Sequence, residues 1–526
     1  MKRVRVVLSR AARFVATCLR VILSGAARLF PAALIGALSL FAFAPFGFWP
    51  FALLSLALGF GMIEVAPTPA RAARVAWAYG LGYFAANTHW IFIALYDYGG
   101  MPALLAVMAV LLLAAFLALY PALVAYVGRR IAGESRAVLL FAALPACWLL
   151  SEWLRGWVFT GFPWAAIGYS QVPGGPLAGW FPLVGVYGVG GLMALLAGAL
   201  AWLMGRHIDR LAGYVAAAAL VVGVSGYGLA RIHWTHPVGK PLRVALAQGA
   251  IPQNQKWSTE DLIYNLRVYY QLIRDAQGDL IVLPETAFPI FLHDVPDDYL
   301  DEILSQARQK HAAMIVGVPR EDGDDRHYFN AAVLLTDAAH PANYKAHLVP
   351  FGEYVPMRPI LGWVYRQVLH MPLDDFSAGA PVQAPLKVGD QRIAANICYE
   401  DVFGEELVPN ARHATILLNL SNLAWFDGSV ALAEHGQIAQ ARSLETGRPS
   451  LLATNSGTTA IVDPQGRYVA KLPERVQANL TGVVQGYEGN TPYLMYGNAA
   501  ALLMAALGLA GVWTARRRSE RALLLA

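Results

Sequence analysis

Three blocks of the sequence combine residue types that support covalent acyl chemistry. Glu285 lies in LPETAFP, Lys345 lies in NYKAHLVPFGEYVP, and Cys398 lies in NICYED. A free thiol has a pKa of about 8.5, and only its thiolate form is a strong nucleophile. A nearby carboxylate can take the thiol proton, and an ammonium can stabilise the oxyanion that forms when the thiolate attacks a carbonyl. The three residue types together predict a covalent catalytic site.

Each of these residues also has an ordinary explanation. A glutamate after a strand is usually solvated or caps a helix, a loop lysine is usually at the surface, and a lone cysteine is usually a small core residue. Cys398 is the only cysteine in the hydrophilic part of the chain, since Cys18 and Cys147 lie in apolar sequence. Its thiol is therefore either buried and inert or reactive. The order of the blocks, with 60 residues from Glu285 to Lys345 and 53 from Lys345 to Cys398, favours the catalytic explanation.

The segment that contains these blocks alternates between predicted strands and helices. The strand-like runs are 242–248, 279–285, 312–319, 330–336, 392–400, 414–420 and 450–456, and the helical stretches are 259–276 and 297–310. Several of the runs are continuously apolar, as expected for a sheet that is covered on both faces. Each chemical block comes at a strand end or in an adjoining loop, where sites tend to form in open α/β sheets. The sequence thus predicts one α/β domain at 232–494.

Composition places most of the remaining chain in lipid. Of the 526 residues, 57% are hydrophobic and only 14% are charged, whereas soluble proteins have about 25% charged residues. A membrane-spanning helix needs about 20 apolar residues. The candidate runs are 29–44, 50–66, 75–95, 102–128, 137–154, 183–204, 212–231 and 495–515. The sequence therefore predicts a bundle of about seven helices at 29–231 and a final transmembrane helix at 495–515.

Basic residues predict the orientation of this bundle. Residues 1–28 form a basic arm that contains seven Lys and Arg residues and no acidic residue, and the tail at 516–526 contains four arginines. The loops at 45–49 and 96–101 contain no Lys or Arg, whereas the loops between them and after them contain several arginines. Because cytoplasmic loops are enriched in Lys and Arg, both termini are expected to be cytoplasmic and the α/β domain is expected to be periplasmic. A basic arm also suits nucleic acid, but beside apolar spans a membrane flank is favoured, and no nucleic-acid partner is expected.

The chemical blocks are similar to those of the nitrilase, or carbon–nitrogen hydrolase, superfamily, whose site is a Glu–Lys–Cys triad. Within it, the chain resembles the apolipoprotein N-acyltransferase family almost from end to end. The strings that carry this resemblance are RGWVFTGFPW (155–164), GYSQ (168–171), QGAIPQNQKW (248–257) and HLVPFGEYVP (347–356). The resemblance implies that the α/β domain is an αββα sandwich attached to an α-helical bundle of about eight transmembrane helices.

The resemblance also implies a role for individual residues. Glu285 corresponds to the general base, Lys345 to the group that stabilises the oxyanion, and Cys398 to the nucleophile. Glu353 corresponds to a second carboxylate that orients Lys345. Backbone N–H groups near Tyr399 are expected to add to the oxyanion site.

Further positions match residues that the family uses to support the site or to bind substrate. They are Tyr399, Glu400, Trp257, Phe351, Tyr354 and Asn422. An interfacial aromatic belt explains Phe351 and Tyr354 equally well. One position departs from the family: Leu423 follows Asn422, where members commonly have aspartate in the string SNDAWF, so the polarity of the pocket near Asn422 is open.

The reaction implied by this resemblance is a two-step acyl transfer in the bacterial inner (cytoplasmic) membrane. Cys398 takes an acyl chain from a phospholipid, with phosphatidylethanolamine as the expected donor, and holds it as a thioester. The acceptor is the N-terminal amine of the diacylglyceryl-cysteine of an apolipoprotein. The histidines show no ligand spacing and there is no glycine-rich phosphate loop, so neither a metal nor a cofactor is expected.

Two other functions are compatible with parts of the sequence. A membrane-tethered nitrilase-type amidase acting on small amides would use the same triad, but a tether needs one span and not eight. A transporter or lipid-binding scaffold would explain polar residues at membrane depth, such as Asn87 and His89, but no paired repeat with broken helices is visible. Glu152 and Arg155 are expected to pair as i,i+3 neighbours that neutralise a helix end.

Overall fold

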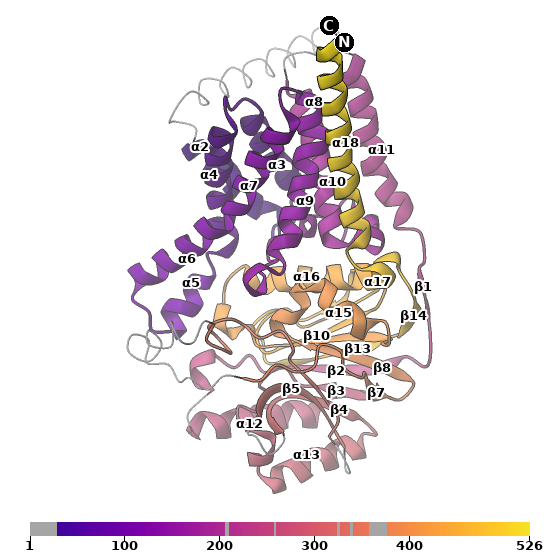
Figure 1. Cartoon of the computed structure of the whole chain (residues 1–526). Coiled ribbons are helices and arrows are strands. Elements are labelled where there is room, and N and C mark those ends of the chain that lie inside the picture. Colours follow the sequence, from indigo (N-terminus) through magenta and orange to yellow (C-terminus); the bar gives the residue numbers. More distant parts are fainter. Residues whose placement is uncertain are drawn as a thin grey trace, which may run out of the picture.

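The protein consists of a helical bundle above an α/β domain (Figure 1). The computed structural model describes residues 29–205, 210–256, 259–322, 327–336, 340–356 and 376–525. The basic arm predicted at 1–28 and the predicted substrate residue Trp257 lie outside these ranges. The other predicted site residues lie within them.

Helices occupy each of the eight apolar runs identified in the sequence. They are α2 (Leu29–Ala37), α3 (Pro50–Glu64), α4 (Pro69–Thr88), α6 (Ala103–Leu117), α7 (Leu119–Ala132), α9 (Leu144–Arg155), α10 (Phe181–Leu203), α11 (Arg210–Leu229) and α18 (Ala499–Leu525). Among the described residues, three helical stretches are long and apolar enough to cross a membrane: Ala103–Ala132, Arg136–Arg155 and Ala178–Leu203. Four others are apolar but shorter: Leu29–Ala42, Pro50–Glu64, Gly213–Leu229 and Ala499–Thr514. The chain is thus a protein with several apolar helices, of which three reach spanning length on their own.

Small residues allow the helices of the bundle to approach closely. α2 packs on α4 at Gly82, where an added Cβ would lie 1.8 Å from the carbonyl oxygen of Ala33. Polar side chains in this region bond within the bundle: Asn87 Nδ2 donates to Ser39 Oγ at 2.8 Å and to the Tyr83 carbonyl at 2.7 Å. Close backbone approach and internal hydrogen bonds are the usual means by which helices associate in lipid. Asn87 is therefore explained by packing.

Glu152 and Arg155 form the expected i,i+3 pair, although their charged atoms lie 4.0 Å apart. Both side chains also bond to the following loop. Arg155 Nη1 donates to the Trp164 carbonyl at 2.7 Å, and Glu152 Oε1 accepts from the Ile167 N–H at 2.7 Å. The pair thus fixes the loop that contains RGWVFTGFPW, beyond neutralising the helix end.

The α/β domain contains two six-stranded sheets that face each other. The first has the order β13-β2-β3-β4-β5-β6 and the second has the order β12-β11-β10-β9-β8-β7. The strands of the first sheet are β2 (Leu242–Gln248), β3 (Leu280–Val282), β4 (Ala313–Asp322), β5 (His327–Leu335), β6 (Ala342–Tyr344) and β13 (Ala478–Val484). Those of the second are β7 (Leu386–Val388), β8 (Gln391–Ile397), β9 (Ile416–Ser421), β10 (Ser450–Thr454), β11 (Ala460–Val462) and β12 (Tyr468–Lys471). A short ladder of β1 (Thr235–Pro237) and β14 (Tyr487–Gly489) joins the domain to its flanking helices.

Apolar side chains from both sheets form one core between them, which includes Val244, Val282, Ile397 and Leu418. Helices α12 (Thr259–Asp275) and α13 (Asp297–Gln309) cover the outer face of the first sheet. Helices α15 (Gly404–Ala411) and α16 (Ala431–Thr446) cover the second sheet. The expected αββα sandwich is confirmed, with continuously apolar central strands because both of their faces are covered.

Helix α16 lies between the second sheet and the bundle (Figure 1), and 15 of its 16 residues are buried. On one side Ala439 packs against residues of β10 and β11. On the other side Ala431, Ile438, Ala441 and Leu444 belong to the core of the bundle. The bundle and the sandwich therefore share a continuous core at α16, which we call the junction.

A break in α10 is matched to this junction. Gly185 has φ 63° and ψ −176°, which interrupts the helix. The Val186 N–H, which follows the break, donates to Glu445 Oε1 on α16 at 2.8 Å. Glu445 in turn pairs with Arg442 at 3.1 Å, and both side chains are buried. A positive φ suits glycine, and Glu445 binds the backbone donor that the break leaves free.

Candidate active site

Cys398 opens a turn at the end of a central strand. The sequence pattern predicted that the strand continues to residue 400, and this was wrong: β8 ends at Ile397, and Cys398 begins a 3-10 helix, η11 (Cys398–Val402). The strand stops because Glu400 Oε2 accepts a hydrogen bond from the Ile397 N–H at 2.7 Å. Cys398 has φ 54°, a region that non-glycine residues rarely adopt outside strained or functional positions.

Glu285 follows β3 and is held by two donors. Its Oε1 accepts from Asn330 Nδ2 at 2.7 Å, and its Oε2 accepts from the Asn422 backbone N–H at 2.7 Å. The side chain is 6% exposed. In addition to burial, the charge of this carboxylate acts on the Cys398 thiol and raises its pKa. The carboxylate is therefore fixed in one orientation beside the thiol.

Lys345 directly follows β6 and is 1% exposed. Its Nζ donates to Glu353 Oε1 at 2.9 Å and lies 3.7 Å from Glu285 Oε1. Burial lowers the pKa of Lys345, but the carboxylates of Glu353 and Glu285 outweigh burial and raise it above its ordinary value. The ammonium is thus charged and fixed by two carboxylates.

Glu353 is positioned by groups around it as well as by Lys345. Its Oε2 accepts from the Val349 N–H at 2.8 Å, and its Oε1 accepts from Asn330 Nδ2 at 3.2 Å. Asn330 therefore bridges the carboxylates of Glu353 and Glu285. The sequence did not single out Asn330, although it begins the predicted strand at 330–336.

The surroundings of the thiol favour its neutral form. Burial and the charge of Glu285 raise the pKa of Cys398 well above its ordinary value, and Lys345 opposes them. Because only the thiolate attacks carbonyl groups efficiently, the site needs a base near the sulfur, and Glu285 is the carboxylate whose charge acts most strongly on the thiol.

Glu400 connects the lysine segment to the cysteine segment. Its Oε1 accepts from the backbone N–H groups of Ala346 at 2.7 Å and His347 at 3.0 Å, while its Oε2 bonds to Ile397. A buried carboxylate that satisfies three backbone donors holds those two segments in register. Its place in the motif is therefore explained by positioning.

Tyr399 links the cysteine turn to the bundle. Its hydroxyl donates to the Gly161 carbonyl at 3.4 Å, and its ring packs on Phe403 with centroids 5.0 Å apart. Gly161 belongs to the loop RGWVFTGFPW that follows α9. This contact brings one of the sequence strings of the bundle to the edge of the α/β site.

The predicted substrate residues differ in their placement. Asn422 is part of the site, because its backbone N–H binds Glu285 and its Nδ2 donates to Gln253 Oε1 at 2.8 Å. Phe351 and Tyr354 lie in the turn around Glu353, where the Phe351 N–H donates to the Tyr354 carbonyl at 2.9 Å. Phe351 is 53% exposed and has φ 66°. Neither aromatic ring contacts the thiol in any described interaction.

Leu423, where the sequence departs from the family, is 2% exposed. It lies against Gly457, where an added Cβ would be 2.6 Å from Leu423 Cδ1. The aliphatic side chain thus fills a buried space, while the adjacent Asn422 keeps the polar contacts.

The backbone behind the cysteine is held by residues that sequence reasoning missed. The Cys398 carbonyl lies 3.0 Å from Asn419 Nδ2 and 3.2 Å from His435 Nε2. His435 also lies 3.3 Å from Asp401 Oδ1, and both side chains are buried. Burial lowers the pKa of His435, but the charge of Asp401 outweighs burial and raises it. Asp401 continues the NICYED block, but His435 carried no signal in the sequence because it comes from α16.

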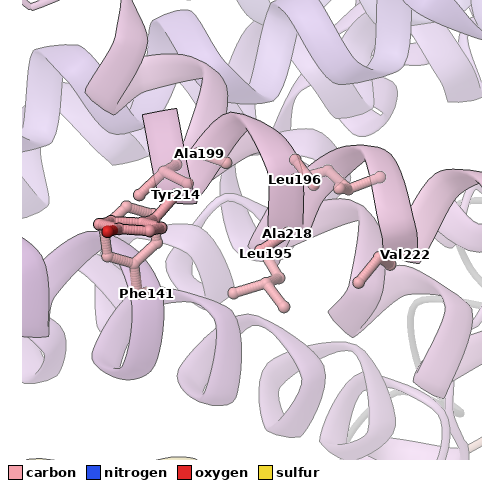
Figure 2. A pocket seen from close by; sticks show the side chains of 9 residues that line it. Phe141, Leu195, Leu196, Ala199, Tyr214, Ala218 and Val222 are labelled. Carbon is pink, nitrogen blue, oxygen red and sulfur yellow. The ribbon is translucent and has the colours of Figure 1, made fainter. Parts of the chain in front are cut away.

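A separate apolar groove lies in the bundle, at α10, α11 and the π-helical turn η4 (Leu139–Ala143). Figure 2 shows Phe141, Leu195, Leu196, Ala199, Tyr214, Ala218 and Val222 around it. Its volume is about 290 Å³. None of the candidate catalytic residues above lines this groove. It differs from the candidate active site because aliphatic and aromatic side chains line it.

Comparison with known families divides the chain in the same way. Residues 35–199 match the family described as apolipoprotein N-acyltransferase N-terminal domain. Residues 243–489 match the family described as carbon-nitrogen hydrolase.

Several curated proteins match nearly the whole chain. Apolipoprotein N-acyltransferase of Chromobacterium violaceum is 46% identical over 94% of this chain and 95% of its own length. The protein of that name from Nitrosomonas europaea is 42% identical over 93% of this chain and 97% of its own length. The protein of that name from Methylococcus capsulatus is 43% identical over 92% of this chain and 95% of its own length.

Proposed function

Since the chain belongs to the apolipoprotein N-acyltransferase family, we propose that it transfers an acyl chain from a membrane phospholipid to the N-terminal amine of a diacylated lipoprotein. It is an acyltransferase of lipoprotein biosynthesis with a lipid acyl donor. The finer steps are derived from the geometry around Cys398. The observation that carries them is the cluster of Cys398, Glu285 and Lys345: the ammonium of Lys345 lies 3.7 Å from the buried carboxylate of Glu285, and both charges act on the thiol.

In the first step, Glu285 takes the proton of Cys398 and the thiolate attacks the ester carbonyl of the donor. The carbonyl oxygen becomes an oxyanion, which Lys345 Nζ and backbone N–H groups of the cysteine turn stabilise. The bond between the carbonyl carbon and the glycerol oxygen then breaks. Glu285 returns the proton to that oxygen, and a lysophospholipid leaves an acyl thioester on Cys398.

In the second step, the neutral α-amine of the acceptor attacks the thioester. Glu285 accepts a proton from the attacking nitrogen, the bond between carbon and sulfur breaks, and the proton passes to the departing sulfur. The products are an amide and the free thiol. A thioester suits this route because it separates one difficult transfer into two easier ones, with a leaving group that amines displace readily.

Residues around the triad are proposed to hold its three side chains in place. Glu353 and Asn330 orient Lys345 and Glu285, and Glu400 holds the lysine and cysteine segments together. Asn422 positions Glu285 through its backbone N–H. Phe351 and Tyr354, in the exposed turn near Glu353, are proposed to contact acyl chains at the mouth of the site, as is Trp257.

We further propose that the enzyme lies in the bacterial inner membrane with its sandwich domain in the periplasm. The distribution of Lys and Arg among the loops supports this orientation. On this proposal residues 29–231 and 495–515 cross the membrane, 232–494 form the catalytic domain, and 1–28 and 516–526 are cytoplasmic. Phosphatidylethanolamine is the proposed donor.

Mapping the acyl adduct tests the nucleophile. After incubation with phospholipid, intact-protein and peptide mass spectrometry should show one acyl mass on Cys398, and hydroxylamine should remove it. The adduct should disappear in Cys398→Ala and remain in the control Cys147→Ser, because Cys147 is a buried cysteine of α9. An adduct that persists in Cys398→Ala would show that the nucleophile is another residue.

A further inference from the structure

A short 3-10 helix beside the active site carries two buried donors that the reaction above does not use. The helix is η8 (Gln253–Gln255), and Lys256 follows it directly. Gln253 and Lys256 are each 2% exposed. Gln253 Nε2 and Lys256 Nζ have no hydrogen-bond partner in the described part of the chain. The two residues are three apart, so they lie on the same side of this turn.

Asn422 links Gln253 to the carboxylate of Glu285, and the charge of that carboxylate acts on Lys256. Gln253 Oε1 accepts from Asn422 Nδ2 at 2.8 Å, and the Asn422 backbone N–H donates to Glu285 Oε2 at 2.7 Å. Burial lowers the pKa of Lys256 to about 8, and the charge of Glu285 is the one that opposes this lowering. The side chains therefore lie on the Glu285 side of the site that contains Cys398.

Leaving these two groups unpaired is costly. A buried donor without a partner destabilises the folded protein, and a buried charge without a partner does so more strongly. Asn422 uses only the oxygen of the Gln253 amide, so its N–H groups are free for a ligand. One neutral and one cationic donor together suit an oxygen acceptor that carries negative charge.

We propose that Lys256 and Gln253 bind a phosphate oxygen of the glycerophospholipid donor. This inference rests on the proposed function, in which the donor ester reacts at Cys398. In a glycerophospholipid the phosphate is separated from the esters only by the glycerol carbons, so it lies near the thiol when an ester is attacked.

The site would distinguish the donor from the acceptor. Both substrates contain acyl esters of a glyceryl group, so ester chemistry alone does not prevent Cys398 from attacking the acceptor. The diacylglyceryl group of the acceptor has no phosphate, and its amine terminus is cationic when protonated. The ammonium of Lys256 therefore pairs with the phosphate of the donor. The glyceryl ester of the acceptor offers this ammonium no negative charge.

The test compares thioester formation from two donors with the same acyl chains, phosphatidylethanolamine and diacylglycerol. Wild-type protein in detergent should form the Cys398 adduct faster from the phospholipid. Since a hydrogen bond to a charged group contributes about 1.5–3 kcal/mol, the Lys256→Gln variant should lower kcat/KM for the phospholipid by about tenfold to a hundredfold. Its rate with diacylglycerol should stay within about twofold of wild type, because no phosphate contact is lost.

Two variants control for indirect effects. Gln255→Ala changes an exposed side chain of the same turn and should keep the donor preference. Lys256→Arg keeps the cation and should keep part of the preference. Inorganic phosphate then separates the sources of the anion. If it slows thioester formation from the phospholipid in wild type but not in Lys256→Gln, the site accepts any phosphate. If wild type prefers the phospholipid and inorganic phosphate does not slow the reaction, the site is filled only by the phosphate of the lipid.

Two results would overturn the inference. Equal rates of wild-type protein with both donors would exclude a phosphate site without the use of any variant. Alternatively, Lys256→Gln could slow both donors equally, which would make Lys256 a residue that acts only through Glu285. Failure of wild-type protein to form a thioester from either donor would instead contradict the proposed function.

Discussion

Two neighbouring charges act in opposite directions on the thiol of Cys398. The carboxylate of Glu285 raises the pKa of the thiol in addition to burial, and the ammonium of Lys345 lowers it. A resting thiol with a raised pKa is unreactive until the base takes its proton. Attack on an ester therefore needs a base, which is the role proposed for Glu285.

This opposition predicts contrary effects of two substitutions. In a background with Cys18 and Cys147 changed to serine, Glu285→Gln should lower the pKa of Cys398 and Lys345→Met should raise it. The pH dependence of iodoacetamide alkylation measures these shifts. Acyl transfer should be lost in both variants, with a loss of about 10²–10³ in rate for the oxyanion residue. Shifts in the same direction would contradict the assigned charges.

The Lys256 site predicts a pH dependence of donor preference. Burial lowers the pKa of Lys256 to about 8, so the ammonium form is present below that pH and is lost as the pH rises through it. The preference for phosphatidylethanolamine over diacylglycerol should therefore fall above pH of about 8. Ratios of initial adduct rates measure the effect, and Lys256→Arg should remove the pH dependence because arginine stays charged.

The sequence identified the candidate catalytic residues more readily than the residues that hold them in place. Glu285, Lys345 and Cys398 were found through local motifs, and the structure brings them together. Asn330 and His435 were missed because they come from distant elements, and only folding places them beside the site. Lys256 lies inside a string that the sequence analysis noted, but its burial depends on tertiary contacts.

At the scale of elements, the polar composition of α16 conceals a buried helix. Its residues Glu434 and Gln437 find partners in the bundle: Trp164 Nε1 donates to Glu434 Oε2 at 2.6 Å, and the Ala44 N–H donates to Gln437 Oε1 at 3.0 Å. A sequence pattern of polar residues would suggest a solvated face. The long central strands were predicted because their apolar runs are continuous, whereas strands of three or four residues such as β6 and β12 have too little pattern to be found.

The ion pair of Arg442 and Glu445 should be important for stability, because it is buried at the junction. Glu445→Gln leaves the arginine charge without its partner, and breaking a buried pair in this way costs about 3–5 kcal/mol. Thermal unfolding in detergent should show a clear fall in Tm. The exposed pair of Arg274 and Asp275 gives the control, and Arg274→Gln should leave Tm nearly unchanged. Equal Tm values for the two variants would show that the junction pair is dispensable.

At the scale of the whole molecule, the bundle and the sandwich occupy opposite ends (Figure 1). Hydropathy correctly located the apolar helices, because long apolar runs are a strong signal. The number of spans is less easily predicted, since helices such as α3, with 15 residues, fall short of a full crossing by composition. Short helices of this kind depend on neighbouring helices to bond their polar groups and to cover their apolar side chains.

The proposed orientation predicts which surface meets each compartment. Lys387, on β7, and Arg71, on α4, are both exposed, and they lie on the sandwich and on the bundle. In intact cells with a permeabilised outer membrane, a membrane-impermeant maleimide should label Lys387→Cys and not Arg71→Cys. Both should be labelled after lysis, which controls for reactivity. The reverse pattern would place the catalytic domain in the cytoplasm.

Because α16 is covered on both sides, the two halves of the protein cannot be separated without harm. A fragment limited to 232–494 would expose Ala431, Ile438, Ala441 and Leu444 to water, although every reactive side chain would still be present. Such a truncated polypeptide should self-associate, so solubility would demand a redesigned helix surface. A hydrolase without the helical bundle could arise from such a protein only if the bundle-facing apolar residues of α16 first became polar.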